Sequence, residues 1–559
     1  QDVESLDKFR SKARAQLSMS PLLDGKIFTE NLEKEYRTIW QFWCKSQANR
    51  CTKIPYNSKT SFNEYYNAAI DRMDEGDDYF AVTLFKYALR KKPDSANALN
   101  NLGISLLNLG PTYYKKSAIS FRQAISLEPS LGIAHKYLGR VLAEMKRPSL
   151  FKEAKDAFET AIELSPEDPE PYYLLATLKL SYGYAADAIS LFRKAIELDP
   201  ENVYFNPENI VFSMNYLPEY SQEDILEESR KWDLRYGWKG KPHDFKSLER
   251  ENSKLRIGYV SADFHRHPVG IFFQAVVVNY NNDLYEIFCY NNRKNIRIDE
   301  VSNLIKSKVE FWRDVYDLTD NDLHSLILND KIDILVDLSG FTAENRLKVF
   351  SRRAAPIQVS WLGYYNTTGI ASMDYVITDG TTVPNGFEKW YSEKVIRMPV
   401  SRFCYTPPFV CPDIESLTVS PKDRIIFGSF NNFSKLTEDV IEAWAQILLR
   451  VPGSKIVLKW KNFTEKSIKE QYRLLFSIQG VAPKRIEFRD ASPPFIMLDE
   501  YNDIDIALDP FPFSGGLTSC EALWMGVPVV TFAGDRPVSR QTAGFLHAIG
   551  FDELIAESV

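Results

Sequence analysis

The hydrophobic pattern of the first 200 residues repeats at nearly constant intervals. Four segments share a phenylalanine, an alanine three positions later and a proline five positions after that. The phenylalanines are Phe85, Phe121, Phe158 and Phe192, which lie 36, 37 and 34 residues apart. A small residue four positions before each phenylalanine lets two helices approach closely, the ring fills the space between them, and the proline ends the second helix. The pattern therefore predicts four helical hairpins over residues 62–203.

These residue types and intervals are typical of tetratricopeptide repeats. Two insertions, near residues 110–116 and 146–151, account for the longer intervals. A stack of such repeats buries a continuous core and leaves a concave face, which usually binds an extended peptide. A plain helical bundle with accidental periodicity is the alternative, and four aligned units argue against it. The repeats predict a protein or peptide partner without chemistry, so a non-catalytic adaptor stays open as a function.

After Asn252 the pattern changes to short apolar runs, each followed by a turn and a helical segment. The predicted strands are 255–264, 285–290, 332–338, 357–363, 375–379, 424–430, 455–460, 485–488, 505–511 and 527–532. Apolar strands that alternate with helices imply parallel sheets covered on both faces. We expect two doubly wound lobes, 254–405 and 424–559, and a helical connector over 204–253. Ligands of such folds bind outside the carboxyl ends of the strands, here in the cleft between the lobes.

Composition and charge narrow the function classes. The net charge of −7 argues against nucleic-acid and anionic-membrane partners, because phosphate binding needs a basic face. No apolar run approaches the ~20 residues of a membrane span. Residues 1–17 are charged and unlike a secretory signal. None of the six cysteines forms a CxxC pair, so we expect no metal site. We also expect no cofactor and a cytoplasmic location.

A glycine-rich turn after the predicted strand 505–511 is the first candidate for chemistry. The turn consists of Gly515, Gly516, Leu517 and Thr518. Free backbone N–H groups and the positive end of the following helix suit a diphosphate. Glu521, one turn into the helix, could accept hydrogen bonds from a ribose. A tight strand-to-helix turn with a capping threonine is the alternative.

Two further strand-end loops carry candidate residues. Lys435 follows the strand 424–430, where its ammonium group could offset charge on a departing phosphate, although most loop lysines are solvated. His265 and His267 follow the strand 255–264 and precede Pro268, a plausible first residue of a helix. A histidine of near-neutral pKa could act as general base toward a hydroxyl acceptor. The alternative is a histidine that caps or packs against the helix.

These segments resemble the protein O-GlcNAc transferase and SPINDLY family of nucleotide-sugar transferases. The matching stretches are LRIGYVSADFHRHPVG, IDILVDLSGFTAENRL, RRAAPIQVSWLGYYNTTGIASMDYVITD, FGSFNNFSK, DIALDPFPFSGGLTSCEALWMGVPVVT and FDELIAES. With the repeats, the resemblance covers nearly the whole chain. It implies an α-solenoid followed by an α/β GT-B fold of two Rossmann-like lobes, and a metal-independent enzyme that inverts the transferred sugar.

The resemblance also implies roles for individual residues. His267 corresponds to a histidine beside the transferred sugar, a candidate base. Lys435 corresponds to a lysine that contacts the donor diphosphate, and Glu521 to an acidic residue on the ribose. Arg485 is expected near the nucleobase. Gly515, Gly516, Leu517 and Thr518 correspond to the phosphate-binding turn.

The donor is not fixed by the resemblance, because different segments resemble different branches. Asn432 and Ser434 stand where the animal enzymes have glutamine and tyrosine, and this segment is more like the plant SPINDLY branch, which uses GDP-fucose. The segment around His267 instead follows the O-GlcNAc branch. We expect transfer of GlcNAc from UDP-GlcNAc to serine or threonine, with GDP-fucose as the alternative donor and UDP-glucose third.

The family grips the peptide backbone with a ladder of asparagines, which is incomplete here. Asn67 and Asn101 occupy the first two ladder positions, and Tyr137 and Leu174 occupy the next two. The range of acceptors therefore need not match that of relatives with longer arms.

Residues 1–45 resemble the C-terminal end of the family and not its N-terminus. A helix from near Thr29 would carry an apolar stripe that must be buried. We expect residues 1–50 to complete the second lobe, within a circularly permuted chain or between chains of a tandem array, with Trp40 and Trp43 in contact with the catalytic half. An ordinary cap on the repeats is the alternative.

Overall fold

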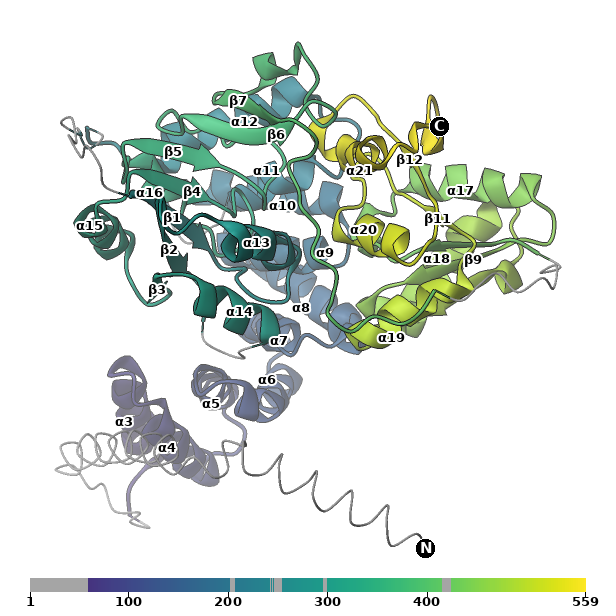
Figure 1. Cartoon of the computed structure of the whole chain (residues 1–559). Helices are drawn as coiled ribbons and strands as arrows, with labels where there is room; N and C mark the ends of the chain where they lie inside the picture. Colours follow the sequence, from purple (N-terminus) through teal and green to yellow (C-terminus); the bar gives the residue numbers. More distant parts are fainter. Residues whose placement is uncertain are drawn as a thin grey trace, which may run out of the picture. The chain divides into compact units, whose positions relative to one another are not determined.

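The computed structural model describes residues 59–201, 207–241, 243, 245, 254–294, 299–414 and 424–559 (Figure 1). The expectations for residues 1–50, including the helix near Thr29 and the contacts of Trp40 and Trp43, lie outside these residues. The chain divides into two compact units, residues 1–108 and 109–559.

The described part of the first unit is three helices. They are α3 (Phe62–Asp74), α4 (Asp78–Lys91) and α5 (Ala96–Asn108). Ser61 begins α3 with a reciprocal capping box to Glu64, the arrangement that pairs two otherwise free backbone donors. Phe85 and its small partners Ala81 and Ala88 are completely buried, as the repeat pattern predicts.

The second unit opens with the rest of the repeats. Its first helices are α6 (Tyr114–Leu127), α7 (Gly132–Glu144), α8 (Phe151–Leu164), α9 (Pro169–Ser181) and α10 (Ala185–Leu198). Phe121, Phe158 and Phe192 are fully buried between them. The two insertions form short 3-10 turns, η3 (Pro111–Tyr113) and η4 (Pro148–Leu150), which explains the longer intervals. The helical repeats predicted from the sequence are confirmed.

Three of the ladder positions have partners inside the repeats or line a cavity. Asn101 donates from Nδ2 to the hydroxyl of Tyr66 at 3.0 Å. The ring of Tyr137 stacks on that of Phe121, with 6.0 Å between centroids. Leu174 lines a cavity formed mainly by the third and fourth repeats. The side chains at 137 and 174 thus offer no amide to a peptide backbone.

The connector helices α11 (Glu208–Met214) and α12 (Gln222–Tyr236) share one buried core with the last repeat and the first lobe. Trp232 packs edge-on against Phe341, with ring centroids 5.6 Å apart. Asn215 donates from Nδ2 to the Tyr364 hydroxyl at 3.2 Å. The last repeat is therefore continuous with the first lobe through the connector.

The first lobe is a seven-stranded parallel sheet with the order β3-β2-β1-β4-β5-β6-β7. Its strands are β1 (Leu255–Ser261), β2 (Tyr285–Asn291), β3 (Phe311–Asp314), β4 (Ile334–Asp337), β5 (Ile357–Ser360), β6 (Tyr375–Asp379) and β7 (Lys394–Met398). Its helices are α13 (Pro268–Asn279), α14 (Glu300–Lys308), α15 (Asp320–Asp330) and α16 (Leu347–Ser351). The chain leaves β1 toward β2 and returns to β4 on the other side, so the strand order reverses between β1 and β4.

The second lobe repeats this plan with a six-stranded parallel sheet of order β10-β9-β8-β11-β12-β13. Its strands are β8 (Ile426–Ser429), β9 (Lys455–Lys459), β10 (Ile486–Arg489), β11 (Ile506–Leu508), β12 (Val529–Phe532) and β13 (Ile555–Ala556). Its helices are α17 (Glu438–Arg450), α18 (Lys466–Ile478), α19 (Pro494–Asp499), α20 (Leu517–Trp524) and α21 (Gln541–Ile549). The order reverses between β8 and β11. No helix of the described residues has the length and apolar character to cross a membrane.

All ten predicted strands are present in the two sheets, and the α/β class is confirmed. Three strands were not predicted: β3, β7 and β13. They lie at sheet edges, and β7 alternates exposed and half-buried residues instead of forming an apolar run. Edge strands lack the continuous hydrophobic signal of a strand buried on both faces.

Gly139 tests the close packing of the repeats. A Cβ at this position of α7 would lie 2.7 Å from the ring of Phe158, which is fully buried and cannot move aside. We expect Gly139→Ala to destabilise the arm by about 1–3 kcal/mol, the usual cost of overpacking. Hydrogen exchange of α7 and α8 in a urea series would measure this. Gly132→Ala is the matched control on the same helix, where the new Cβ would lie no closer than 3.2 Å to a neighbour. Equal protection in both variants would contradict the prediction.

Candidate active site

A cavity of about 530 Å³ lies between the two lobes. Four of the loops that line it follow the strands at which the strand order reverses. His267 follows β1, Thr342 follows β4, Lys435 follows β8 and Thr518 follows β11. The reversal of strand order opens a crevice at the carboxyl edge of each sheet, and the two crevices face each other. The fold therefore places the cavity where doubly wound proteins bind ligands.

The glycine-rich turn at the start of α20 presents its backbone to the cavity. The Gly515 N–H donates to Asp509 Oδ1 at 2.6 Å, which fixes the turn from behind. Gly516 precedes the helix and provides no side-chain cap, so the first turn keeps free backbone donors. A Cβ on Gly516 would meet nothing within 4 Å, so no protein atom requires glycine here. The open approach to this helix end suits an anion.

Lys435 lies at the same end of the cavity, on the 3-10 turn η6 (Phe433–Lys435). Its Nζ donates to the Ser514 carbonyl oxygen at 2.8 Å and lies 4.3 Å from the centre of the Phe513 ring. Burial lowers the pKa of Lys435 to about 8, although the carboxylate of Asp509 opposes the shift. The ammonium group is thus held beside the glycine-rich turn with its charge only partly compensated.

Glu521 lies one turn into α20 and also lines the cavity. Burial raises the pKa of Glu521 to about 8, and the positive charge of Arg266 opposes this only weakly. Within the described residues its carboxyl group has no hydrogen-bond partner. A carboxyl group with free acceptor positions in a half-buried site suits a hydroxyl-bearing ligand.

His267 is the N-cap of α13 and borders the cavity from the first lobe. The Val269 N–H donates to its Nδ1, with 3.4 Å between the two nitrogens, and Asp263 Oδ2 lies 3.5 Å from the same ring nitrogen. Both contacts use the same ring nitrogen, which leaves Nε2 without a partner among the described residues. Burial lowers the pKa of His267, and Asp263 opposes the shift. Gly270 makes this loop possible, because a Cβ there would lie 2.1 Å from the His265 carbonyl oxygen.

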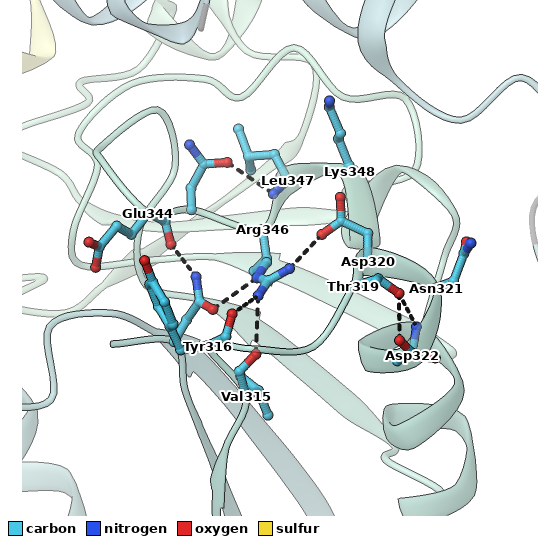
Figure 2. A network of polar contacts seen from close by, with 12 residues as sticks. Val315, Tyr316, Thr319, Asp320, Asn321, Asp322, Glu344, Arg346, Leu347 and Lys348 are labelled. Atoms are coloured by element: carbon cyan, nitrogen blue, oxygen red, sulfur yellow. Dashed lines mark hydrogen bonds and ion pairs between the residues drawn. The ribbon is translucent and has the colours of Figure 1, made fainter. Parts of the chain in front are cut away.

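Arg346 holds the loop that carries Thr342 (Figure 2). The guanidinium group donates to Asn292 Oδ1 at 2.9 Å and to Asp320 Oδ1 at 2.9 Å. It also donates to the carbonyl oxygens of Val315 and Tyr316, both at 3.1 Å. One side chain thus ties the ends of β2 and β3 and the start of α15 to the loop after β4. The wall of the cavity that Thr342 forms is fixed from outside the cavity.

Most residues predicted for the site lie together in this cavity. The predicted residues that line the cavity are His267, Asn432, Lys435, Gly516, Leu517, Thr518 and Glu521. Gly515, the first residue of the turn, does not line the cavity, and its N–H donates to Asp509. The structure does not bring Arg485 to the cavity. Its guanidinium donates to the carbonyl oxygens of Leu448, Val451 and Ser454, at 2.6, 3.0 and 2.7 Å.

Arg485 precedes β10, at the amino edge of the sheet, whereas the cavity lies at the carboxyl edge. Its contacts hold the loop between α17 and β9 on that far edge. The expectation that Arg485 lies near a nucleobase therefore finds no support in its position, and the residue is structural.

The sequence analysis missed several residues of the cavity. The largest group follows β9 and β10, and it consists of Lys459, Trp460, Lys461, Ala491, Ser492 and Met497. Lys459 is 4% exposed, donates to Ser492 Oγ at 2.7 Å and pairs with Glu500 at 2.6 Å. Position after a predicted strand end was the available signal for these residues. Tyr365 also follows a predicted strand, 357–363, whereas Phe212 of the connector carried no such signal.

The chain is similar in sequence and in fold to known proteins. The profile of glycosyl transferase family 41 matches residues 238–407 and 415–559, more than half of the chain, and a tetratricopeptide-repeat profile matches residues 169–202. Among solved structures, a point mutant of the Thermobaculum terrenum O-GlcNAc transferase is similar at a TM-score of 0.74 and 32% identity. The match covers 83% of this chain and 87% of that one.

Curated plant proteins are also similar to this chain. A probable UDP-N-acetylglucosamine–peptide N-acetylglucosaminyltransferase SPINDLY of Oryza sativa subsp. japonica is 34% identical over 385 residues, 66% of this chain and 40% of that protein. A protein of the same description named SEC, from Arabidopsis thaliana, is 31% identical over 305 residues, 53% of this chain and 31% of that protein. The chain thus spans about two fifths of the length of its SPINDLY relatives.

The position of Arg485 leads to a prediction about stability. Arg485→Met removes the donors that satisfy three backbone carbonyl groups, and we expect a loss of about 1–3 kcal/mol in the free energy of unfolding of the second lobe. Nucleotide affinity should stay within about twofold of the unaltered protein. Urea unfolding and calorimetric titration with UDP and GDP would measure both, with Lys484→Met, an exposed neighbour, as control. A loss of nucleotide affinity without a loss of stability would contradict the prediction and show that Arg485 contributes to binding.

Proposed function

The chain belongs to glycosyl transferase family 41, and we propose that it transfers a sugar from a nucleotide-sugar to serine or threonine hydroxyl groups of proteins. The observation that carries this is the pairing of Lys435 with the uncapped start of α20 in one cavity, opposite His267. A cation and free backbone donors fit a diphosphate, and an imidazole with a free nitrogen fits a hydroxyl acceptor. The repeats supply the surface for a protein acceptor.

The reaction is a single displacement. The acceptor oxygen forms a bond to the anomeric carbon as the bond from that carbon to the diphosphate oxygen breaks, and the configuration inverts. The proton passes to His267 Nε2 or to a phosphate oxygen of the donor. Nε2 offers the lone pair that a base needs in the tautomer with a proton on Nδ1, in which Nδ1 donates to Asp263 and no longer accepts from the Val269 N–H. The lowered pKa of His267 keeps the ring neutral near pH 7, as this role requires.

The leaving diphosphate is stabilised by the protein itself. Lys435 and the backbone donors of Gly516, Leu517 and Thr518 lie where negative charge develops on the departing oxygen. Fixed donors and cations act strongly there because they need no reorganisation during the reaction. This role is the one that a metal ion fills in many other transferases, and the proposed reaction needs none.

UDP-GlcNAc is the proposed donor. The plant relatives are named as probable UDP-N-acetylglucosamine–peptide N-acetylglucosaminyltransferases, and the solved relative is an O-GlcNAc transferase. Glu521 would accept hydrogen bonds from the ribose. The aromatic and polar group after β9 and β10 would surround the base. GDP-fucose is the alternative donor, because Asn432, which lines the cavity, belongs to the segment that resembles the SPINDLY branch.

Lys435→Ala tests the proposed function. We expect turnover to fall by about 10² or more, since the substitution removes a cation that stabilises the leaving group. Transfer to a peptide mixture would be measured in EDTA, with thermal unfolding measured alongside. Lys466→Ala is the control, because that side chain is 88% exposed and lies outside the cavity. A near-normal rate in Lys435→Ala, or activity that only Mg²⁺ or Mn²⁺ restores, would contradict the mechanism.

The donor nucleotide can be tested without an acceptor. We expect UDP to bind at least tenfold more tightly than GDP, a difference of about 1.4 kcal/mol. Isothermal titration of each nucleotide, followed by displacement with UDP-GlcNAc and GDP-fucose, would measure it. Tighter binding of GDP would make the chain a fucosyltransferase and reverse the order of donors.

A further inference from the structure

A second cavity, of about 660 Å³, opens between the repeats and the second lobe. We call it the arm groove. Its walls come from α7, η4, α8 and α9, and from Lys461 of the 3-10 turn η7 (Lys461–Thr464). A smaller cavity of about 250 Å³ shares Ser181 and Lys461 with the arm groove. It shares Phe212, Asn432, Trp460 and Lys461 with the active-site cavity. The three cavities therefore lie next to one another, from the arm groove to the active site.

Direct contacts fix the arm groove relative to the active site. The Tyr184 hydroxyl donates to Gln471 Oε1 on α18 at 2.9 Å. The backbone at Gly183 lies so close to the second lobe that a Cβ there would be 3.1 Å from the Phe433 ring and 3.2 Å from the Ser434 Cα. Tyr182 packs against the core of the second lobe. The last repeat is thus docked beside the loop that carries Lys435.

The charged residues of the arm groove are mostly positive. They are Arg140, Lys146, Arg147 and Lys461, opposed by Glu144. Arg140 makes a loose ion pair with Glu170, with 3.7 Å between Arg140 Nη1 and Glu170 Oε1. Among the described residues, the other three cations have no ion pair, and all three are exposed. A chain with a net charge of −7 therefore gathers uncompensated positive charge beside its active site.

Two of these cations, Lys146 and Arg147, come from the insertion in the third repeat. Lys146 follows α7 with a left-handed backbone, φ 49°, at a place where helices usually end in glycine. Pro148 begins η4, and Phe151 then packs on Tyr182 with 4.2 Å between ring centroids. The insertion thus turns the chain so that Lys146 and Arg147 lie at the groove, above an apolar wall that includes Phe151 and Tyr182.

We propose that the arm groove binds an acidic segment of the acceptor protein, with aspartate or glutamate residues flanking the hydroxyl that is modified. This inference rests on the proposed function, since it names the acceptor that the transferase selects. Cations that are exposed and unpaired attract such a segment over the distance that salt screening allows, and they set orientation and encounter rate more than affinity. The groove adjoins the smaller cavity that borders the active-site cavity, so a segment held there would lie close to the site of transfer.

The test uses three acceptor peptides that differ only in the residues flanking one serine, which are glutamate, glutamine or lysine. We expect kcat/KM to decrease in that order, with about tenfold between the glutamate and lysine peptides, and the difference to shrink in high salt. The variant Lys146→Glu/Arg147→Glu should remove or reverse the preference. These two residues do not line the active-site cavity, so its nucleotide affinity should be unchanged, and this also verifies folding.

Lys115→Glu/Lys152→Glu is the matched control, because both lysines are exposed on the arm and neither lines the arm groove. The control should keep the preference for glutamate. Equal kcat/KM for the three peptides, or a preference that survives Lys146→Glu/Arg147→Glu, overturns the inference and leaves the transferase activity intact. If no peptide is modified, the proposed function fails, and fluorescence anisotropy of the labelled glutamate and lysine peptides still tests the groove by itself.

Discussion

The placement of the last repeat beside the cleft depends on one buried polar network under the connector. Asn366 donates from Nδ2 to Asn215 Oδ1 at 3.0 Å and to Gln222 Oε1 at 3.2 Å, and Gln222 Nε2 donates back to Asn366 Oδ1. All three side chains are at most 3% exposed. Buried amides are costly when unpaired, so only the register that satisfies all of them is stable. The network fixes both connector helices on the first lobe, and the last repeat follows because it shares their core.

This network explains why the sequence predicted the helices and strands better than the contacts between the repeats, the connector and the lobes. The period of the repeats and the apolar runs of the sheets are local signals, and they located the hairpins and ten strands. Loop residues such as Lys435 and Thr518 could be assigned to a site because carboxyl ends of parallel strands share an edge. Phe212 reaches the same cavity only through the packing of the connector on the lobe. No periodicity within its own segment records that packing.

Arg485 shows the converse limit. Its loop adjoins a strand of the second lobe, and the resemblance implied a position near the base. The polarity of the strand decides against this, because the residue precedes β10 and therefore lies at the amino edge. In a parallel sheet, a displacement by one strand length carries a residue from the ligand to the opposite side of the lobe. The direction of the chain through the strand was visible in the sequence and was the more reliable guide.

The cavity gathers groups that the protein leaves only partly paired. Lys435 and Glu521 have pKa values that burial moves toward neutrality, and the first turn of α20 has no cap. Each of these features costs stability in the unliganded protein, and local rules of this kind are usually broken at functional sites. A ligand with both negative charge and hydroxyl groups would satisfy all three, since phosphate favours the charged form of Lys435 and a hydroxyl can donate to Glu521. The same features that weaken the lobe therefore fit a ligand with both phosphate and hydroxyl groups, as the proposed nucleotide-sugar donor has, better than a simple anion.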